Sequence, residues 1–355
     1  MSKTYRMGVI GLGMGINMLP VNTRADIPIE VTHICGVSSQ KDVMAGLKQK
    51  YALKDCTDDY LQLIEDPQID IIGVFSPDPL HYEHAKAALE AGKHVICTKP
   101  MVVSLEQSKE LVRLVDKTGV KFMVGQTMRY EAQFAAIRKM FDDGELGDLF
   151  LGEAHYVHDM RDLFIATPWR GDMPQDLIYG GLSHPVDALR WFFGDVEEVH
   201  AIGQETELLK SRSGKPYGDF SNYLVNLKFK NGVVARAMGL YGIVHPPMPM
   251  MGVSLYGTKG SAVAEFSDFL GGKVKAVFDK YEIKSAFESN YPPETEGAFG
   301  HGRTAIRYLE NFGRSLVQDF EPQPSVREGA KTIATCAAAY ESMKTGKIVK
   351  VFNEF

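Results

Sequence analysis

Two short segments of this 355-residue chain carry side chains whose types and spacing suit proton transfer. Lys99 ends an apolar run and precedes Pro100, which disfavours helical geometry in the residue before it. His184 lies near the expected start of a helix, and Asp187 follows three residues later on the same face, where a carboxylate can orient the imidazole. We therefore predict that His184 and Asp187 form an acid–base unit, and that Lys99 lies at a strand end where ligands bind in open parallel sheets. The alternatives are a lysine that closes a strand and an aspartate that complements a helix dipole.

A glycine-rich turn follows the first apolar run of the chain, residues 5–10. Gly11, Gly13 and Gly15 permit a tight turn and allow backbone N–H groups to approach a pyrophosphate. The dinucleotide fingerprint has glycine or alanine at position 16, where this chain has Ile16. Because the turn follows a predicted strand in an alternating β/α region, we predict a dinucleotide site rather than an ordinary turn.

The residues after the second apolar run, 31–37, bear on which dinucleotide is bound. An acidic residue at this place would bind the ribose 2′-hydroxyl of NAD, but the chain has Ser38, Ser39 and Lys41 instead. Hydroxyls and a lysine suit a 2′-phosphate, so we predict NADP or NAD, with a preference for NADP. Ser39 is also placed to act as the N-cap of the next helix.

The third apolar run, 69–75, leads into Ser76, Pro77 and His81. Because these residues follow a strand, we expect them either to line a nicotinamide pocket or to form a proline-rich turn before the next helix. His84 lies three residues after His81, but no further ligands stand nearby, and we predict no metal site. The residues predicted to bind the dinucleotide are Gly11, Gly13, Gly15, Ser38, Ser39, Lys41, Ser76, Pro77, His81, Lys99 and Pro100.

The elements that must position these residues fall into two groups. Residues 1–125 alternate strand and helix patterns, which predicts an α/β domain with a doubly wound parallel sheet. Residues 126–355 contain strand-like runs interrupted by one helix at 184–193, and two helices near the end. We predict an α+β second domain with a large, mostly antiparallel open sheet. Residues 288–300, rich in proline, glutamate and glycine, are predicted to form a loop.

The composition excludes some functional classes. The formal net charge of −6 gives no sign of a basic face, so we expect neither nucleic acid nor a membrane surface as a partner. No segment is long and apolar enough to span a bilayer. The four cysteines are scattered without CxxC spacing, and four glycines interrupt the N-terminal apolar run where a signal peptide would be continuous. We therefore expect a cytoplasmic protein.

Taken together, these motifs resemble the glucose–fructose oxidoreductase/inositol dehydrogenase (Gfo/Idh/MocA) family along nearly the whole chain. The resemblance implies an N-terminal Rossmann domain and hydride transfer between a nicotinamide and a hydroxyl carbon of a sugar, inositol or related polyol. The matching segments are the glycine turn 11–15, 77–81, 91–95, Lys99-Pro100, Arg129-Tyr130, 144–147, His184 to Asp187 with Arg190-Trp191, and 342–347.

The resemblance also implies roles for single residues. Lys99 matches the lysine of the family's Glu-Lys-Pro motif, which contacts the substrate and helps catalysis, and His184 matches the proposed acid/base histidine. The resemblance thus implies that Lys99 is catalytic together with His184 and Asp187. Thr98 stands in place of the motif's glutamate, and Gly180 stands where the family often has an aspartate. The candidates to complete the proton relay are Asp187, Asp176 and a substrate-bound water.

The expected reaction is the oxidation of a secondary alcohol or the reverse reduction, in which His184 takes the hydroxyl proton and Lys99 hydrogen-bonds the same oxygen. The family's use of the open second-domain sheet implies a homodimer or homotetramer. A non-catalytic dinucleotide sensor and a reductase of dihydrodiols or imines are the alternatives. The side chains predicted to contact the carbohydrate-like substrate are Arg129, Tyr130, His155, His158, Asp159, Trp169, Arg170 and His184.

Overall fold

The computed structural model describes residues 3–167, 169–173, 176–209, 218–267, 271–278, 282–289 and 302–355. The chain divides into two compact units. The first unit comprises Met1–Thr127, Glu294–Ala330 and Phe355, and the second comprises Met128–Pro293 and Lys331–Glu354. The sequence-based division at 125/126 placed residues 294–330 in the second domain, whereas the structure includes them in the first unit.

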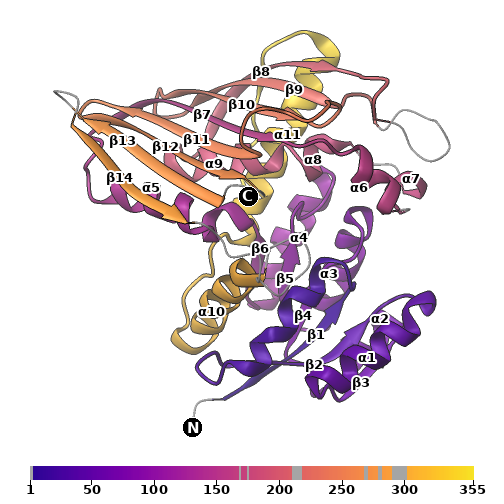
Figure 1. Cartoon of the computed structure of the whole chain (residues 1–355). Coiled ribbons are helices and arrows are strands. Elements are labelled where there is room, and N and C mark those ends of the chain that lie inside the picture. The colour runs from indigo at the N-terminus through magenta and orange to yellow at the C-terminus, as the bar shows by residue number, and fades with distance from the viewer. Residues whose placement is uncertain are drawn as a thin grey trace. The chain divides into compact units, whose positions relative to one another are not determined.

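The first unit is built on a six-stranded sheet in the order β3-β2-β1-β4-β5-β6 (Figure 1). Every strand pair is parallel, and this order is typical of dinucleotide-binding folds. All residues of β4 and β6 are buried, as expected where helices cover both faces of a sheet. The strands are β1 (Tyr5–Ile10), β2 (Ile29–Cys35), β3 (Asp55–Thr57), β4 (Ile71–Val74), β5 (His94–Thr98) and β6 (Phe122–Gly125).

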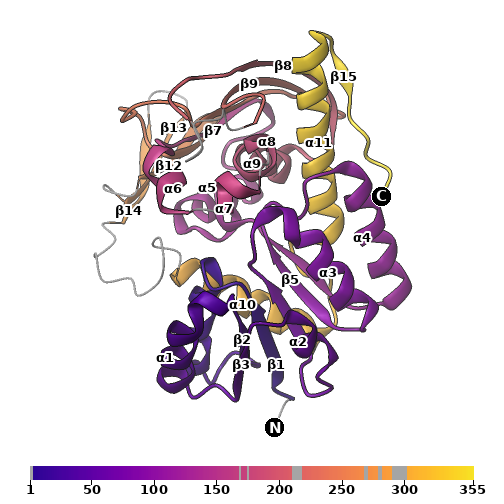
Figure 2. The same cartoon turned by 90° about the vertical axis from the view of Figure 1, so that its right-hand side faces the viewer.

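Helices lie on both faces of this sheet (Figure 2). They are α1 (Lys41–Tyr51), α2 (Tyr60–Glu65), α3 (His81–Glu90), α4 (Leu105–Thr118) and α10 (Gly302–Gln318). The first crossover is a 3-10 helix, η1 (Met14–Thr23), which contains Pro20. Helix α10 packs against η1, and the Tyr308 hydroxyl lies 3.0 Å from the Met18 sulfur. This packing explains why a late segment of the chain belongs to the first unit.

The second unit is built on a nine-stranded sheet in the order β14-β13-β12-β11-β7-β10-β9-β8-β15. Among its described strands, only β7 and β10 pair in parallel. The predicted fold class, a doubly wound parallel sheet followed by a mostly antiparallel α+β region, is therefore confirmed. The strands are β7 (Leu149–Val157), β8 (Val196–Gln204), β9 (Asn222–Phe229), β10 (Val234–Leu240), β11 (Met251–Gly257), β12 (Gly260–Ser267), β13 (Gly271–Phe278), β14 (Ile283–Ser289) and β15 (Val349–Lys350).

One face of this sheet is covered by helices (Figure 1). Helix α9 (Ser183–Phe193) packs against β7, β10 and β11, and α5 (Ala132–Asp142) packs against β12, β13 and β14. Strand β9 shows the resulting alternation, because Val225 and Leu227 are buried while Leu224 and Lys228 are exposed. The remaining helices are α6 (Arg161–Ala166), α7 (Trp169–Asp172), α8 (Leu177–Gly180) and α11 (Val326–Thr345), whose residues belong to both units.

The sequence patterns did not predict four of the strands, β3, β13, β14 and β15. Of the predicted loop at 288–300, residues 288 and 289 end β14 and the rest lie outside the described residues. In the described part of the chain, no helix is both long and apolar enough to cross a membrane.

Candidate dinucleotide and acid–base sites

The glycines of the first turn have different structural roles. Gly11 has a φ of +96°, and a Cβ there would lie 2.3 Å from the Phe75 carbonyl oxygen, so only glycine fits. A Cβ at Gly15 would lie 2.7 Å from Val9, which shows that Gly15 permits the close approach of η1 to β1. The fingerprint assigns this packing role to its third glycine, so Gly15 supplies it one position before Ile16.

Gly13 differs from its neighbours because no atom lies within 4 Å of the position that its Cβ would take. It directly precedes η1, and no side chain caps this helix start. Uncapped N–H groups at the start of a helix, with open space around the preceding glycine, suit the phosphates of a dinucleotide. The residues of this turn therefore fit the pyrophosphate of the predicted dinucleotide.

A narrow pocket opens at the carboxyl ends of β5 and β6 in the first unit. Thr98, which stands in place of the family's glutamate, contributes to its wall. Lys99 is half-buried on the bend that follows, in non-helical geometry as Pro100 favours. The other lining residues are Met14, Asn17, Met18, Phe75, Gly125, Thr127, Ala305 and Tyr308.

His81 connects two backbone segments beside this pocket. Its Nδ1 lies 2.7 Å from the Pro100 carbonyl oxygen, and its Nε2 lies 2.7 Å from the Ser76 carbonyl oxygen. The side chain has no exposed surface. These contacts fix the bend that carries Lys99 against the Ser76-Pro77 turn, so the structure supports a positioning role for His81 rather than direct contact with a dinucleotide.

A carboxylate that the sequence reading missed stands among the residues expected to bind a 2′-phosphate. The Ser38 hydroxyl donates to Asp58 Oδ2 at 2.6 Å, and Lys41 Nζ lies 4.0 Å from the same oxygen. The hydrogen bond from Ser38 lowers the pKa of Asp58, which favours its ionised form. Ser39 is not an N-cap, because α1 begins after Gln40.

In the second unit, Asp187 is the centre of a buried polar network. Its carboxylate accepts hydrogen bonds from Arg129 Nε at 2.7 Å and Nη2 at 2.8 Å, and from the Thr332 hydroxyl at 3.2 Å. Arg190 in turn donates to the Thr332 hydroxyl at 2.9 Å. The side chains of Arg129 and Asp187 are only 7% and 1% exposed. Asp187 therefore holds α9 to the segment before α5 and to α11, a structural role that its spacing from His184 does not reveal.

His184 is buried among tyrosines. Its ring packs edge-on against Tyr156 with a centroid distance of 5.0 Å, and Tyr156 contacts Tyr241 at 5.4 Å. The Tyr156 hydroxyl lies 3.2 Å from His158 Nδ1, which brings two predicted histidines to the same ring. A Cβ at Gly181 would lie 2.4 Å from the Tyr241 hydroxyl oxygen, so the glycine before α9 allows this close packing.

Asp176, the second candidate for the missing relay aspartate, is largely buried, and burial raises its pKa. Its Oδ1 accepts hydrogen bonds from the Tyr223 hydroxyl at 2.7 Å and from the backbone N–H of Ile178 at 2.9 Å. The aspartate thus acts as the N-cap of α8. Asp176 therefore binds Tyr223 and caps α8, and neither of these contacts involves His184.

The other predicted substrate residues are distributed over several elements. Burial raises the pKa of Tyr130 and lowers that of His155, whose Nε2 lies 3.1 Å from the Pro249 carbonyl oxygen. Arg161 donates to both carboxylate oxygens of Asp159 and holds its pKa well below the usual range. In α7, the guanidinium of Arg170 stacks over Trp169 at 4.3 Å. Across the described residues, no three His, Cys, Asp or Glu side chains are grouped to hold a metal.

Two family models match the chain. One, described as an oxidoreductase family with an NAD-binding Rossmann fold, matches residues 5–126. The other, described as the C-terminal alpha/beta domain of an oxidoreductase family, matches residues 138–351. Together they cover both of the sheets described above.

Individual proteins show the same similarity. The uncharacterized oxidoreductase YrbE of Bacillus subtilis is 30% identical over 282 residues, which is 75% of each chain. Levoglucosan dehydrogenase of Pseudarthrobacter phenanthrenivorans is 24% identical over 336 residues, which is 85% of each chain. A solved structure of levoglucosan dehydrogenase, in complex with NADH and L-sorbose, has a TM-score of 0.86 at 22% identity and covers 99% of this chain and 100% of that chain. This last similarity establishes a shared fold.

Proposed function

The chain belongs to the Gfo/Idh/MocA oxidoreductase family, as its motifs indicated, and we propose that it transfers hydride between a nicotinamide dinucleotide and a secondary alcohol or ketone of a sugar, inositol or related polyol. The observation that carries this proposal is the glycine turn, with Gly11 and Gly15 fixed by packing and open space at Gly13. The name of the levoglucosan dehydrogenase relative supports a carbohydrate-like substrate.

The dinucleotide is NAD(H) or NADP(H), held by the glycine turn and by residues at the carboxyl ends of the first unit's strands. When bound, its nicotinamide ring accepts or supplies the hydride. Ser38, Ser39 and Lys41 favoured NADP in the sequence reading, but Asp58 engages two of these three side chains. Ser76, Pro77, Lys99 and Pro100 stay predicted contacts of the same dinucleotide.

His184 is proposed to take the proton from the substrate hydroxyl during oxidation and to return it during reduction. Lys99 is proposed to hydrogen-bond the same oxygen and to stabilise its developing negative charge. Asp187 acts on His184 by holding α9 in place, through Arg129 and Thr332. The remaining proposed substrate contacts are Tyr130, His155, His158, Asp159, Trp169 and Arg170, with Arg129 acting through Asp187.

The test is turnover with a panel of sugars, sugar acids and inositols, assayed with both cofactors. For an accepted substrate, Lys99→Ala and His184→Ala should each lower kcat/KM by about 10²–10⁴-fold, as expected for an acid–base group. His184→Ala should retain NADH binding, measured by nicotinamide fluorescence, which separates a loss of chemistry from unfolding. A decrease of threefold or less in kcat/KM would contradict the assignment. Cofactor binding without turnover of any panel compound would favour a sensor instead.

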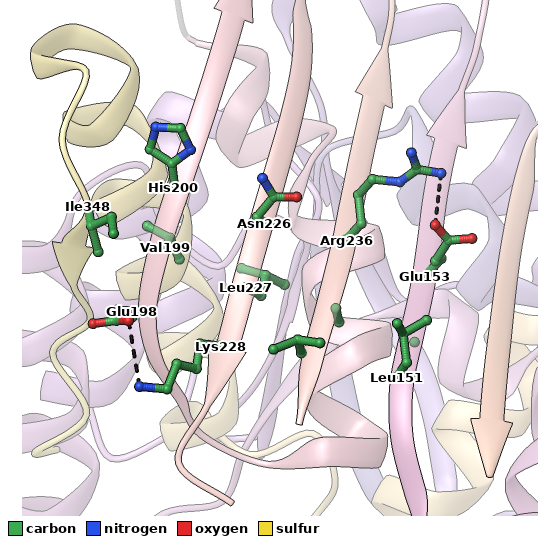
Figure 3. A pocket seen from close by; sticks show the side chains of 13 residues that line it. Leu151, Glu153, Glu198, Val199, His200, Asn226, Leu227, Lys228, Arg236 and Ile348 are labelled. Carbon is green, nitrogen blue, oxygen red and sulfur yellow. Dashed lines mark ion pairs between the residues drawn. The ribbon is translucent and has the colours of Figure 1, made fainter. Parts of the chain in front are cut away.

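We also propose that the protein is a homodimer or homotetramer formed through the open face of the nine-stranded sheet. Figure 3 shows side chains of β7, β8, β9 and β10 projecting from this face, with Ile348 beside them. Exposed apolar residues, including Leu224, Val234 and Ile348, accompany ion pairs of Arg236 with Glu153 and of Lys228 with Glu198. Such a mixed face suits a second copy of the same chain.

Light scattering coupled to size-exclusion chromatography tests this interface. Leu224→Asp should shift the protein to the monomer, because a buried carboxylate without a partner is costly in an interface. Leu61→Asp, at an exposed leucine of α2 in the first unit, is the matched control and should not change the mass. A Leu224→Asp protein with an unchanged oligomeric mass would refute the proposed interface.

We propose a cytoplasmic location, which the four free cysteines support.

A further inference from the structure

We infer that Asp58 makes this protein select NAD(H) over NADP(H), in place of the acidic residue that the second strand lacks. The inference rests on the dinucleotide site proposed above and adds a specificity residue to it. An acidic group in this position binds the ribose 2′-hydroxyl of NAD and repels the 2′-phosphate of NADP.

The backbone brings Asp58 to the required edge of the sheet. Strand β3 pairs in parallel with β2, with Cys35 opposite Thr57, and the Gly36 N–H donates to the Thr57 carbonyl oxygen at 3.1 Å. Asp58 therefore follows directly after the carboxyl end of the strand next to β2. The Gly11 N–H donates to the Cys35 carbonyl oxygen at 2.8 Å, which connects the glycine turn to the same edge. The carboxyl ends of β1, β2 and β3 thus lie next to one another along one edge of the sheet.

The side-chain contacts show what Asp58 can accept. Its carboxylate already binds one hydroxyl, that of Ser38, at 2.6 Å. Its side chain is 40% exposed, so oxygen lone pairs remain for a second hydroxyl from solvent or ligand. A ribose 2′-hydroxyl can donate to such an acceptor, whereas a phosphate ionised to about −1.5 to −2 near neutral pH cannot do so favourably.

Lys41 does not reverse this preference. Its ammonium group lies 4.0 Å from Asp58 Oδ2, so a large part of its field at this position is cancelled by the carboxylate. Ser38 donates its only hydroxyl hydrogen to the same carboxylate. Asp58 therefore engages two of the three side chains that favoured a 2′-phosphate in the sequence, and its charge offsets the attraction of Lys41 for a phosphate.

Dissociation constants of the full-length protein for NADH and NADPH, measured by nicotinamide fluorescence, test the inference without requiring a substrate. The wild type should bind NADH at least about tenfold more tightly than NADPH. Asp58→Asn, which keeps an acceptor for Ser38 but removes the charge, should reduce this ratio by about tenfold. Adding Lys41→Ala to Asp58→Asn should weaken NADPH binding more than NADH binding.

Asp55→Asn is the matched control. Asp55 begins β3, about 10 Å from Asp58 along the strand, and pairs with Lys48, so it tests the same change of charge away from the site. Its NADH/NADPH ratio should stay within about twofold of wild type. Tighter NADPH binding by the wild type, or an Asp58→Asn ratio equal to that of wild type, would overturn the inference while leaving the dinucleotide site intact. Binding of neither cofactor by the wild type would overturn the proposed function itself.

Discussion

The buried pair of Arg129 and Asp187 allows a strong test of how the second unit is held together. Arg129→Met keeps much of the side-chain stem but removes the bidentate partner of the Asp187 carboxylate, which is 1% exposed and still accepts a hydrogen bond from the Thr332 hydroxyl. Loss of one partner from a buried ion pair costs about 3–5 kcal/mol. The contact of Arg129 with Trp191, 5.8 Å from the ring centroid, is also lost. We therefore expect the free energy of unfolding of this unit to decrease by about 3–5 kcal/mol.

Tryptophan fluorescence during urea denaturation measures this change selectively. The chain has two tryptophans, Trp169 and Trp191, and both lie in the second unit. The control is Arg236→Met, because the pair of Arg236 with Glu153 at 2.8 Å is 53% and 37% exposed and should contribute at most about 1 kcal/mol. If Arg129→Met costs no more than Arg236→Met, the reasoning about burial is refuted.

A double variant separates positioning from catalysis. Arg129→Met combined with Asp187→Leu removes both charges, so it should recover much of the stability that Arg129→Met loses. If Asp187 only holds α9, the double variant should regain kcat/KM to within about tenfold of wild type, a loss smaller than most acid–base deletions. If Asp187 takes part in the proton relay, stability should recover while kcat/KM stays at least about 10²-fold low.

Two further predictions concern the first unit. Burial lowers the pKa of His84 to about 4, so the unfolded chain binds a proton more readily than the folded one. The neutral His84 therefore does not reduce the free energy of unfolding above about pH 6.5, and this free energy should fall as the pH drops from about 6.5 toward 4. Calorimetry should find a weaker pH dependence of stability over this range in His84→Gln. Gly11→Ala should destabilise the unit by at least about 1–3 kcal/mol, because a Cβ would meet the Phe75 carbonyl at a φ of +96°. Gly13→Ala should leave the melting temperature nearly unchanged and weaken NADH binding, because its side chain enters open space; equal melting temperatures for the two variants would contradict this division of roles.

The elements that were predictable are those with a strong local pattern. Buried parallel strands such as β4 are continuous apolar runs, and α4 is bounded by Ser104 as N-cap and Gly119 at its end. Strand β3 has three residues, Asp55, Cys56 and Thr57, and no apolar run, so only pairing with β2 defines it. Strand β13 did carry an alternating signal, with Lys273 and Lys275 exposed and Val274 and Ala276 buried, that could have been found.

The residues of the site show where local reasoning ends. Spacing along a helix determines that His184 and Asp187 share a face, but not which segment packs against that face. Arg129 reaches Asp187 across 58 residues of sequence, and Ser38 reaches Asp58 across 20. Asp187 was assigned from its neighbour His184 in sequence, and Asp58 was missed. In both cases a partner from another element determines the role of the carboxylate. An acidic residue one strand away can therefore replace the one absent after β2, and the cofactor preference should follow the charge that the fold assembles rather than the residues that adjoin the motif.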